Sequence, residues 1–191
     1  PVDNPFFDFE AAQASQKLEL SAQQRDAVLA ALNEGALVIT GGPGTGKTTI
    51  IRFITAIMES MGLSVELTAP TGRAAKRMSD ATGHEARTIH RLLEYIPGEG
   101  FMRDGDDPLL CDMVIVDEMS MVDVPLMHAL LKAVLVGTRF IMVGDSDQLP
   151  SVGAGDVLRD VIASGAIRVV RLDEIFRQAQ KSMIVTNAHR I

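Results

Sequence analysis

The octapeptide Gly41-Gly42-Pro43-Gly44-Thr45-Gly46-Lys47-Thr48 constrains the fold more than any other feature, because it fits the pattern G-x-x-x-x-G-K-[ST]. The apolar run 36–40 precedes it and predicts a buried strand. Over 47–61, apolar residues recur at helical spacing, and Gly62 predicts the end of that helix. A strand, a glycine-rich loop and a helix in this order predict a phosphate-binding loop in an α/β fold.

This loop predicts a nucleoside triphosphate site, because its glycines let successive backbone N–H groups point at phosphate oxygens beside the positive end of a helix. Lys47 is expected to reach the β- and γ-phosphates, and the Thr48 hydroxyl to hold Mg²⁺. The predicted nucleotide contacts in and after the loop are Gly42, Pro43, Gly44, Thr45, Gly46, Lys47, Thr48 and Thr49.

A second strand, 112–116, runs directly into Asp117 and Glu118. The carboxyl edge of a doubly wound sheet is where such folds bind ligands. Asp117 is therefore predicted to hold Mg²⁺, and Glu118 to orient or deprotonate the attacking water. This division of roles predicts hydrolysis of the nucleotide and not binding alone.

Further apolar runs at 64–68, 138–143 and 167–172 predict more strands of the same sheet. The loop after 138–143 contains Gln148, a candidate sensor of the γ-phosphate. Arg177 follows the last run and is a candidate arginine finger. With Lys47 and Glu118, these two residues complete the predicted catalytic set.

Seven motifs follow one another in an order that resembles the first motor domain of superfamily 1 DNA helicases, in particular the RecD-like branch of the exodeoxyribonuclease V alpha-subunit type. They are Leu20-Ser21-Ala22-Gln23-Gln24, the phosphate-binding loop, Thr68-Ala69-Pro70-Thr71-Gly72-Arg73-Ala74-Ala75, Thr88-Ile89-His90-Arg91-Leu92-Leu93, Val116-Asp117-Glu118, Gly144-Asp145-Ser146-Asp147-Gln148-Leu149-Pro150 and Ile175-Phe176-Arg177-Gln178.

The resemblance implies a RecA-like core: a mostly parallel sheet with helices on both faces and a small hairpin insertion. It also implies ATP and Mg²⁺ as cofactors, and 5′ to 3′ movement on single-stranded DNA with unwinding at duplex junctions. Gln24 would contact adenine, although 20–32 is also simply an amphipathic helix capped by Ser21. The implied DNA contacts are Pro70, Thr71, Gly72, Arg73, Thr88, His90 and Arg91.

The charge distribution agrees with a local DNA site. The chain is acidic, with a net charge of −7, which argues against general coating of nucleic acid. Residues 68–93 nevertheless carry five basic and two acidic side chains, a local net charge of 5 − 2 = +3. Hydroxyl and backbone N–H groups in this segment suit phosphate contacts that carry no base identity.

Residues 94–110 are rich in glycine and acidic residues, and they predict a small hairpin insertion. In RecD-like helicases, this interval holds a short pin against which the duplex splits. Tyr95 and Phe101 have two interpretations, stacking on bases or packing of the hairpin against the core. An acidic tip would repel phosphate, so the sequence leaves both interpretations open.

Length and composition fit one motor domain, because the chain has 191 residues of which 47% are hydrophobic. We expect 1–19 to be a lead-in, 20–191 the first RecA-like domain, and a second RecA-like domain of the same parent chain to lie outside this sequence. A single cysteine, Cys111, fits a reducing cytoplasm, and no apolar run is long enough to predict a membrane span.

Three other interpretations remain. A P-loop kinase acting on a small molecule would need a substrate lid after the core, and no arginine-rich lid is visible. A DNA-binding module switched by ATP would bind without unwinding. A helicase domain of the conjugative relaxase type is the nearest alternative within the same class.

Overall fold

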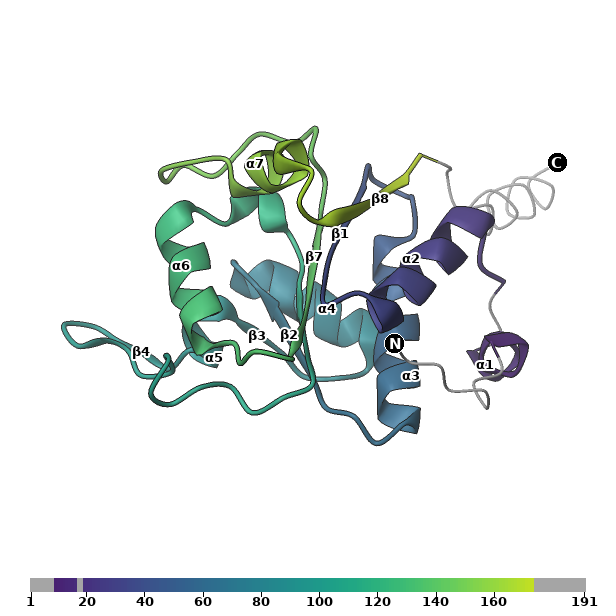
Figure 1. Cartoon of the computed structure of the whole chain (residues 1–191), viewed down its shortest axis with the longest axis horizontal. Helices are drawn as coiled ribbons and strands as arrows, with labels where there is room; N and C mark the ends of the chain where they lie inside the picture. The colour runs from purple at the N-terminus through teal and green to yellow at the C-terminus, as the bar shows by residue number, and fades with distance from the viewer. Residues whose placement is uncertain (1–8, 17–18, 174–191) are drawn as a thin grey trace, which may run out of the picture.

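The computed structural model describes residues 9–16 and 19–173, and its centre is a six-stranded sheet (Figure 1). The strand order is β3-β2-β6-β7-β1-β8, and all neighbouring strands are parallel. The strands are β1 (Ala36–Gly41), β2 (Val65–Ala69), β3 (Ala86–Thr88), β6 (Met113–Val116), β7 (Arg139–Gly144) and β8 (Arg168–Leu172).

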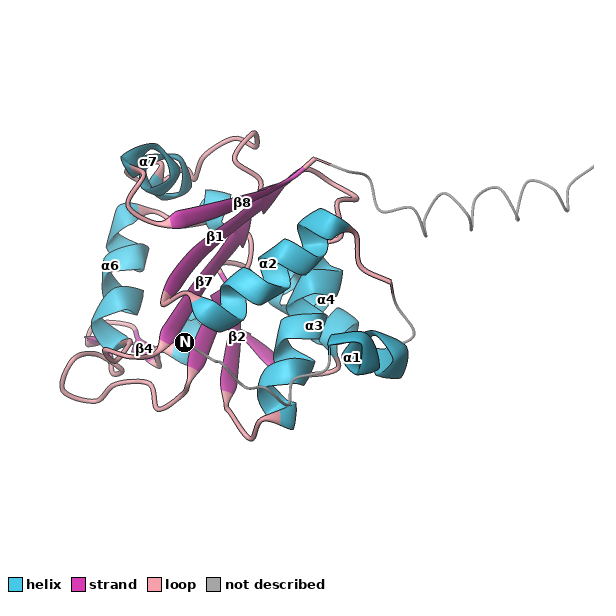
Figure 2. Cartoon of the chain, turned by 45° about the vertical axis from the view of Figure 1, so that its right-hand side comes forward, coloured by secondary structure: helices cyan, strands magenta, loops and turns pink. Residues whose placement is uncertain are grey.

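Helices cover both faces of this sheet, with α2 and α3 on one side and α6 on the other in both ribbon views (Figures 1 and 2). The helices are α1 (Phe9–Gln16), α2 (Ala22–Asn33), α3 (Lys47–Ser60), α4 (Gly72–Thr82), α5 (Ile89–Leu92), the 3₁₀ turn η1 (Met119–Met121), α6 (Val124–Ala133) and α7 (Val157–Ser164). This arrangement confirms the predicted α/β fold class, a mostly parallel sheet between two helical layers.

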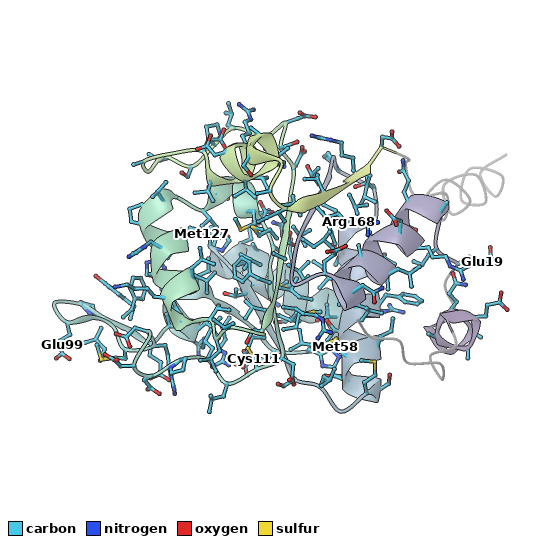
Figure 3. The ribbon with its side chains drawn as sticks, viewed as in Figure 1. Glu19, Met58, Glu99, Cys111, Met127 and Arg168 are labelled. Carbon is cyan, nitrogen blue, oxygen red and sulfur yellow. The ribbon has the colours of Figure 1, made fainter. Side chains whose placement is uncertain are left out.

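Two apolar layers form because successive side chains of a strand point to opposite faces. In β1, Leu37 and Ile39 pack with α2 and α3, whereas Val38 packs with α6 and α7. Figure 3 labels one methionine from each layer, Met58 on α3 and Met127 on α6. Because both faces are covered, the strands read as continuous apolar runs, which is typical of a buried parallel sheet.

The register brings the carboxyl ends of the central strands to one edge. Thr40 lies beside Gly144, Val116 beside Met142, and Ala69 beside Thr88. All the loops that carry the predicted site residues of the described part therefore open on the same edge of the sheet, where doubly wound folds bind their ligands.

The predicted hairpin is present, and it lies apart from the main sheet (Figure 1). The antiparallel strands β4 (Tyr95–Ile96) and β5 (Gly100–Phe101) form it within 94–110. The backbone N–H groups of Met102 and Arg103 donate to the carbonyl of Leu93 and so tie its base to the end of α5.

The residues after Glu118 form two elements and not one continuous helix. The segment divides into η1 and α6, and Pro125 lies in the first turn of α6, where its fixed φ favours a new helix start. Met119 is fully buried, whereas the side chain of Met121 is 46% exposed. Each described helix is too short or too polar to traverse a lipid bilayer.

Candidate nucleotide site and nucleic-acid interface

The phosphate-binding loop follows β1, and its backbone shape requires glycine. Gly44 and Gly46 have φ values of 77° and 85°, in the left-handed region that side chains disfavour. Gly41 has a different constraint, because a Cβ there would lie 2.7 Å from Thr45 Oγ1 and 2.9 Å from two atoms of Leu172. A Cβ added at the neighbouring Gly42 would meet no atom within 4 Å.

Lys47, the first residue of α3, bends back over this loop. Its Nζ donates to the carbonyl oxygens of Gly41 and Gly42, the latter at 2.9 Å. Thr45 Oγ1 donates to the same Gly42 carbonyl at 2.8 Å. The ammonium is therefore already oriented above the loop and close to the N-terminus of α3, where anions are favoured.

Gln24 joins helix α2 to the same loop. Its side-chain oxygen accepts from the Ser21 backbone N–H at 3.0 Å, and Ser21 Oγ accepts from the Gln24 N–H, forming a capping box. Its Nε2 donates to the Thr45 carbonyl at 3.2 Å, and the residue is only 2% exposed. The predicted helix cap at Ser21 is confirmed, and the adenine contact of Gln24 stays a prediction.

Asp117 directly follows β6, at the same edge of the sheet as the phosphate-binding loop. Its backbone N–H donates to the Thr68 carbonyl at 2.9 Å, and its Oδ1 accepts from the Glu118 N–H at 2.8 Å. Burial raises the pKa of the Asp117 carboxyl, while the positive charges of Lys47 and Arg77 act in the opposite direction.

Glu118 adopts a left-handed backbone conformation, with φ 55° and ψ 40°, at the start of η1. Such a conformation is costly for a residue with a side chain and is concentrated at functional sites. Its carboxylate forms an ion pair with Arg77 of α4, in which Arg77 Nη2 donates to Glu118 Oε1. Sequence reasoning assigned no role to Arg77, although its spacing of four from Arg73 places both on one helix face.

The residues present fit a magnesium ion, as the donor chemistry shows. Thr48 offers a hydroxyl and Asp117 a carboxylate, and no group of three or more His, Cys, Asp or Glu side chains within the described ranges could hold a metal by itself. Mg²⁺ usually takes one or two carboxylates and completes its shell with water and substrate phosphates, so a sparse protein donor set suits it.

Gln148 lies in the loop after β7, and hydrogen bonds tie this loop to the site. Ser120 Oγ donates to Gln148 Oε1 at 3.4 Å, which connects the loop to η1, the turn that follows Glu118. Nearer the sheet, the Ser146 N–H donates to Thr40 Oγ1 at 3.2 Å. The structure therefore brings together Lys47, Asp117, Glu118 and Gln148 on one edge, while Arg177 lies outside the described residues.

The two segments of the predicted DNA interface meet because β2 and β3 are neighbours. Thr71 is the N-cap of α4, where Oγ1 accepts from the Ala74 N–H at 3.2 Å. Thr88 is the N-cap of α5 and accepts from the Arg91 N–H, also at 3.2 Å. The two helix N-termini thus open on the same edge, in an arrangement that suits phosphate.

Ion pairs engage some of the five basic side chains of this region. Lys76 pairs with Asp80 at 3.1 Å, and Arg87 pairs with Glu66 at 2.9 Å. Across the described part of the chain, no acidic side chain forms an ion pair with Arg73, a predicted DNA contact. Its charge is therefore available at the surface.

His90, Tyr95 and Phe101 form a cluster of three rings, with centroid separations of 5.0 to 5.6 Å. Phe101 packs against the apolar layer that contains α5 and α6. These contacts support the packing interpretation of the hairpin for Phe101, whereas the side chain of Tyr95 is 45% exposed. The cluster also connects His90, a predicted DNA contact, to the hairpin.

Fold and site together define a P-loop nucleoside triphosphatase domain of the RecA-like kind. Residues 24–154 match the model of a family described as "AAA domain". The match covers more than half of the chain, so the chain belongs to this family.

Its relatives place it in the RecD branch. The ATP-dependent RecD2 DNA helicase of Deinococcus radiodurans is 41% identical over 189 residues, which cover 99% of this chain and 26% of that protein. The RecBCD enzyme subunit RecD of Mycobacterium tuberculosis is 41% identical over 169 residues, covering 76% and 29% respectively. The chain thus spans about a quarter of the length of the curated relatives it matches.

Solved structures agree on the fold. A crystal structure of the Pif1 helicase from Candida albicans superposes with a TM-score of 0.62 at 25% identity, covering 88% of this chain and 43% of that one. A Bacteroides Pif1 in complex with ADP-AlF4 gives 0.58 at 22% identity, covering 84% and 43%. These likenesses confirm the predicted fold class, a mostly parallel sheet with helices on both faces.

Proposed function

We propose that this chain is the first motor domain of an ATP-dependent DNA helicase, which hydrolyses ATP to move along single-stranded DNA and to unwind duplex at junctions in the cytoplasm. One observation carries the proposal: the phosphate-binding loop after β1 and the acid pair after β6 lie on the same edge of one parallel sheet, where β7 pairs with both strands. The Deinococcus radiodurans relative is an ATP-dependent DNA helicase by name, the Mycobacterium tuberculosis relative is the RecD subunit of the RecBCD enzyme, and both support the same assignment.

Each predicted residue has a role that its position supports. Lys47 and the backbone N–H groups of residues 42 and 44–49 would hold the phosphates, with Lys47 leaving its loop carbonyls for phosphate oxygens. Thr48 and Asp117 would hold Mg²⁺, which when bound neutralises developing charge on the phosphates. Glu118 would orient and deprotonate the attacking water, and Gln148 would contact the γ-phosphate.

The proposed DNA path runs over the N-termini of α4 and α5, along Pro70, Thr71, Gly72, Arg73, Thr88, His90 and Arg91. Their polar groups suit the sugar-phosphate backbone and carry no base identity, as a translocating motor requires. Movement in the 5′ to 3′ direction is proposed from the likeness to RecD-type helicases alone.

Arg73 gives a quantitative test of this path. In Arg73→Ala, the slope of log affinity against log salt for oligo(dT) should fall by about 0.7, the value for one phosphate contact with a single strand. The loss should be similar for oligo(dT) and for mixed sequences, because phosphates carry no base identity. An unchanged slope would remove Arg73 from the path.

The deciding experiment measures ATP hydrolysis by the full-length protein with and without oligo(dT). We expect stimulation by the oligonucleotide and loss of hydrolysis in Lys47→Ala. Hydrolysis that DNA does not affect would favour a small-molecule P-loop enzyme. ATP-dependent DNA binding without unwinding would favour a switched binding module. The conjugative relaxase alternative is separated by testing the full-length protein for strand nicking.

Residues 1–191 alone should bind Mg·ATP and hydrolyse it very slowly. Residues 1–191 retain Arg177, but we expect the second RecA-like domain to supply a further arginine, and a missing arginine finger alone costs about 10³ to 10⁵ in rate. The comparison uses residues 1–191 beside a chain extended through that domain. Full activity of 1–191 would show that the catalytic site is not shared between two domains.

A further inference from the structure

Helix α4 connects the proposed DNA path to the acid pair. It begins at the Thr71 cap, and Arg73 and Arg77 follow one helical turn apart on an exposed face. Its other face is fixed, because Ala74, Ala75 and Met78 are buried. A shift of the Thr71 turn would therefore move the two arginines together.

Arg77 reaches Glu118 because the elements that carry them are neighbours. Strands β2 and β6 pair directly, and the Asp117 N–H donates to the Thr68 carbonyl near the end of β2. Lys76, next in sequence, instead pairs with Asp80 within α4. Among the described ion pairs of the three α4 cations, the contact with Glu118 is the one that leaves the helix.

This ion pair opposes the proposed role of Glu118. The Arg77 guanidinium donates to Glu118 Oε1 and holds the carboxylate toward α4, which opposes its orientation toward an attacking water. The Glu118 side chain is 22% exposed, whereas that of Arg77 is 64% exposed, so an incoming anion reaches the arginine more easily. Phosphate is such an anion, because its oxygens match the guanidinium fork.

We propose that Arg77 is a positioning residue that couples DNA binding to ATP hydrolysis. Without DNA, Arg77 holds the Glu118 carboxylate toward α4 and away from the attacking water. When single-stranded DNA binds along α4, a backbone phosphate competes for Arg77 and releases Glu118. This inference rests on the proposed function, since it takes Glu118 as the water-activating group and α4 as part of the DNA path.

The first test measures ATP turnover of the full-length protein with and without oligo(dT). In Arg77→Ala, the rate without DNA should rise by up to about fivefold, the population factor that an exposed ion pair supports. The rate at saturating DNA and the KM for ATP should stay the same, so the stimulation ratio falls. Arg77→Lys keeps the charge and should restore part of that ratio.

Lys76→Ala is the matched control, since it removes a positive charge from the same exposed helix without touching Glu118. It should keep the wild-type ratio. A rise in KM for ATP in Arg77→Ala, with no change in the DNA-free rate, would mean that Arg77 contacts nucleotide phosphate, and it would overturn the proposal.

The second test needs no ATP and uses the reciprocity of coupled binding. If DNA and Glu118 compete for Arg77, then Glu118→Gln should tighten binding of oligo(dT) by up to about fivefold in the absence of nucleotide. In the Arg77→Ala background, the same change should have no effect. Asp80→Asn removes a carboxylate from α4, so it measures how much the loss of any negative charge near the path tightens DNA binding. The effect of Glu118→Gln on DNA affinity must be larger.

The outcomes separate this inference from the proposed function. DNA-stimulated hydrolysis with an unchanged ratio in Arg77→Ala, or additive effects of the two substitutions on DNA affinity, would overturn the inference and leave the helicase assignment intact. A wild-type protein that neither hydrolyses ATP nor binds oligo(dT) would overturn both.

Discussion

The phosphate-binding loop and the acidic strand end face each other across one edge of the sheet, yet they are held in different ways. In the loop, Lys47 and Thr45 both donate to the Gly42 carbonyl, and Gln24 donates to the Thr45 carbonyl from a buried position. At the acidic end, burial disfavours the charge of Asp117, and Glu118 has a strained backbone and an exposed partner.

This difference shows where the site stores unfavourable energy. The hydrogen bonds of Lys47, Thr45 and Gln24 to carbonyl oxygens of the loop hold the loop in one shape. The acidic end carries desolvation and backbone strain, which a cation and a bound phosphate would partly relieve. Hydrogen bonds thus stabilise the loop, whereas the burial of Asp117 and the backbone strain of Glu118 reduce stability at the acidic end.

The largest expected effect separates the function of the phosphate-binding loop from that of the acidic strand end. Glu118→Gln should lower hydrolysis by about 10² to 10⁴, the usual contribution of a general base, and should leave Mg·ATP binding close to wild type. Lys47→Ala should lower both, because a hydrogen bond to a charged group is worth about 1.5–3 kcal/mol. Titration with a fluorescent ATP analogue and single-turnover hydrolysis measure the two quantities.

Equal losses of affinity in both variants would show that the acidic end also holds the nucleotide. Near-normal hydrolysis in Glu118→Gln would remove that residue from the catalytic role. Thermal unfolding of each variant without nucleotide is the control for a damaged fold.

A substitution at Gly41 tests how rigid the phosphate-binding loop is. Gly41→Ala should cost about 1–3 kcal/mol of the free energy of unfolding, because its Cβ would meet Thr45 Oγ1 at 2.7 Å and Leu172 at 2.9 Å. Gly42→Ala is the matched control, since the space beside it is open, and it should change stability by less than about 0.5 kcal/mol. Urea unfolding without nucleotide measures both, and equal values would mean that the loop relaxes freely.

Asp117→Asn should have a smaller effect of opposite sign. Because burial raises the pKa of Asp117, the folded state favours the protonated carboxyl, and ionisation reduces stability as pH rises through the unfolded and then the folded pKa. Asparagine avoids this loss and can still accept from the Glu118 N–H. We expect a gain of about 1 kcal/mol at neutral pH, the usual size of such stabilising changes, with no gain in acid.

Urea unfolding of wild type and Asp117→Asn at several pH values tests the sign. A variant that is less stable than wild type at neutral pH would show that attraction to Lys47 and Arg77 outweighs burial. Added Mg·ATP should stabilise wild type more than the variant, because Asp117 is the proposed metal ligand.

Much of the fold could be predicted from the sequence because its signals are local. Each of the five strands predicted from apolar runs is present with its bounds shifted by at most one residue, and the cap at Ser21 is confirmed. Strand β3 was not predicted, because three half-buried residues give no periodic signal. Its pairing with β2 is a property of the folded sheet.

The site was predicted as a set of residues and not as a set of contacts. The pattern around Lys47 fixes the loop chemistry, but nothing in the spacing shows that Lys47 binds its own loop carbonyls or that Gln24 reaches Thr45. The pair of Arg77 and Glu118 joins residues 41 positions apart. Such contacts depend on strand order, which a single sequence does not specify.

The smallest expected effect concerns the stability contributed by that pair. Arg77 and Glu118 are 64% and 22% exposed, and Lys76 and Asp80 are 77% and 66% exposed, so solvent screens both pairs. Exposed ion pairs are usually worth about 0.2–1 kcal/mol. Arg77→Ala and Lys76→Ala should therefore each lower the free energy of unfolding by less than about 1 kcal/mol, and by similar amounts.

Urea unfolding at low and high salt measures this difference, which should shrink as salt increases because the Debye length falls. A loss above about 2 kcal/mol in Arg77→Ala alone would mean that the left-handed backbone of Glu118 depends on its partner, and that the acidic end is held as firmly as the loop. Similar small losses would instead show that Arg77 can leave Glu118 at little cost to the fold, as release of Glu118 by a DNA phosphate requires.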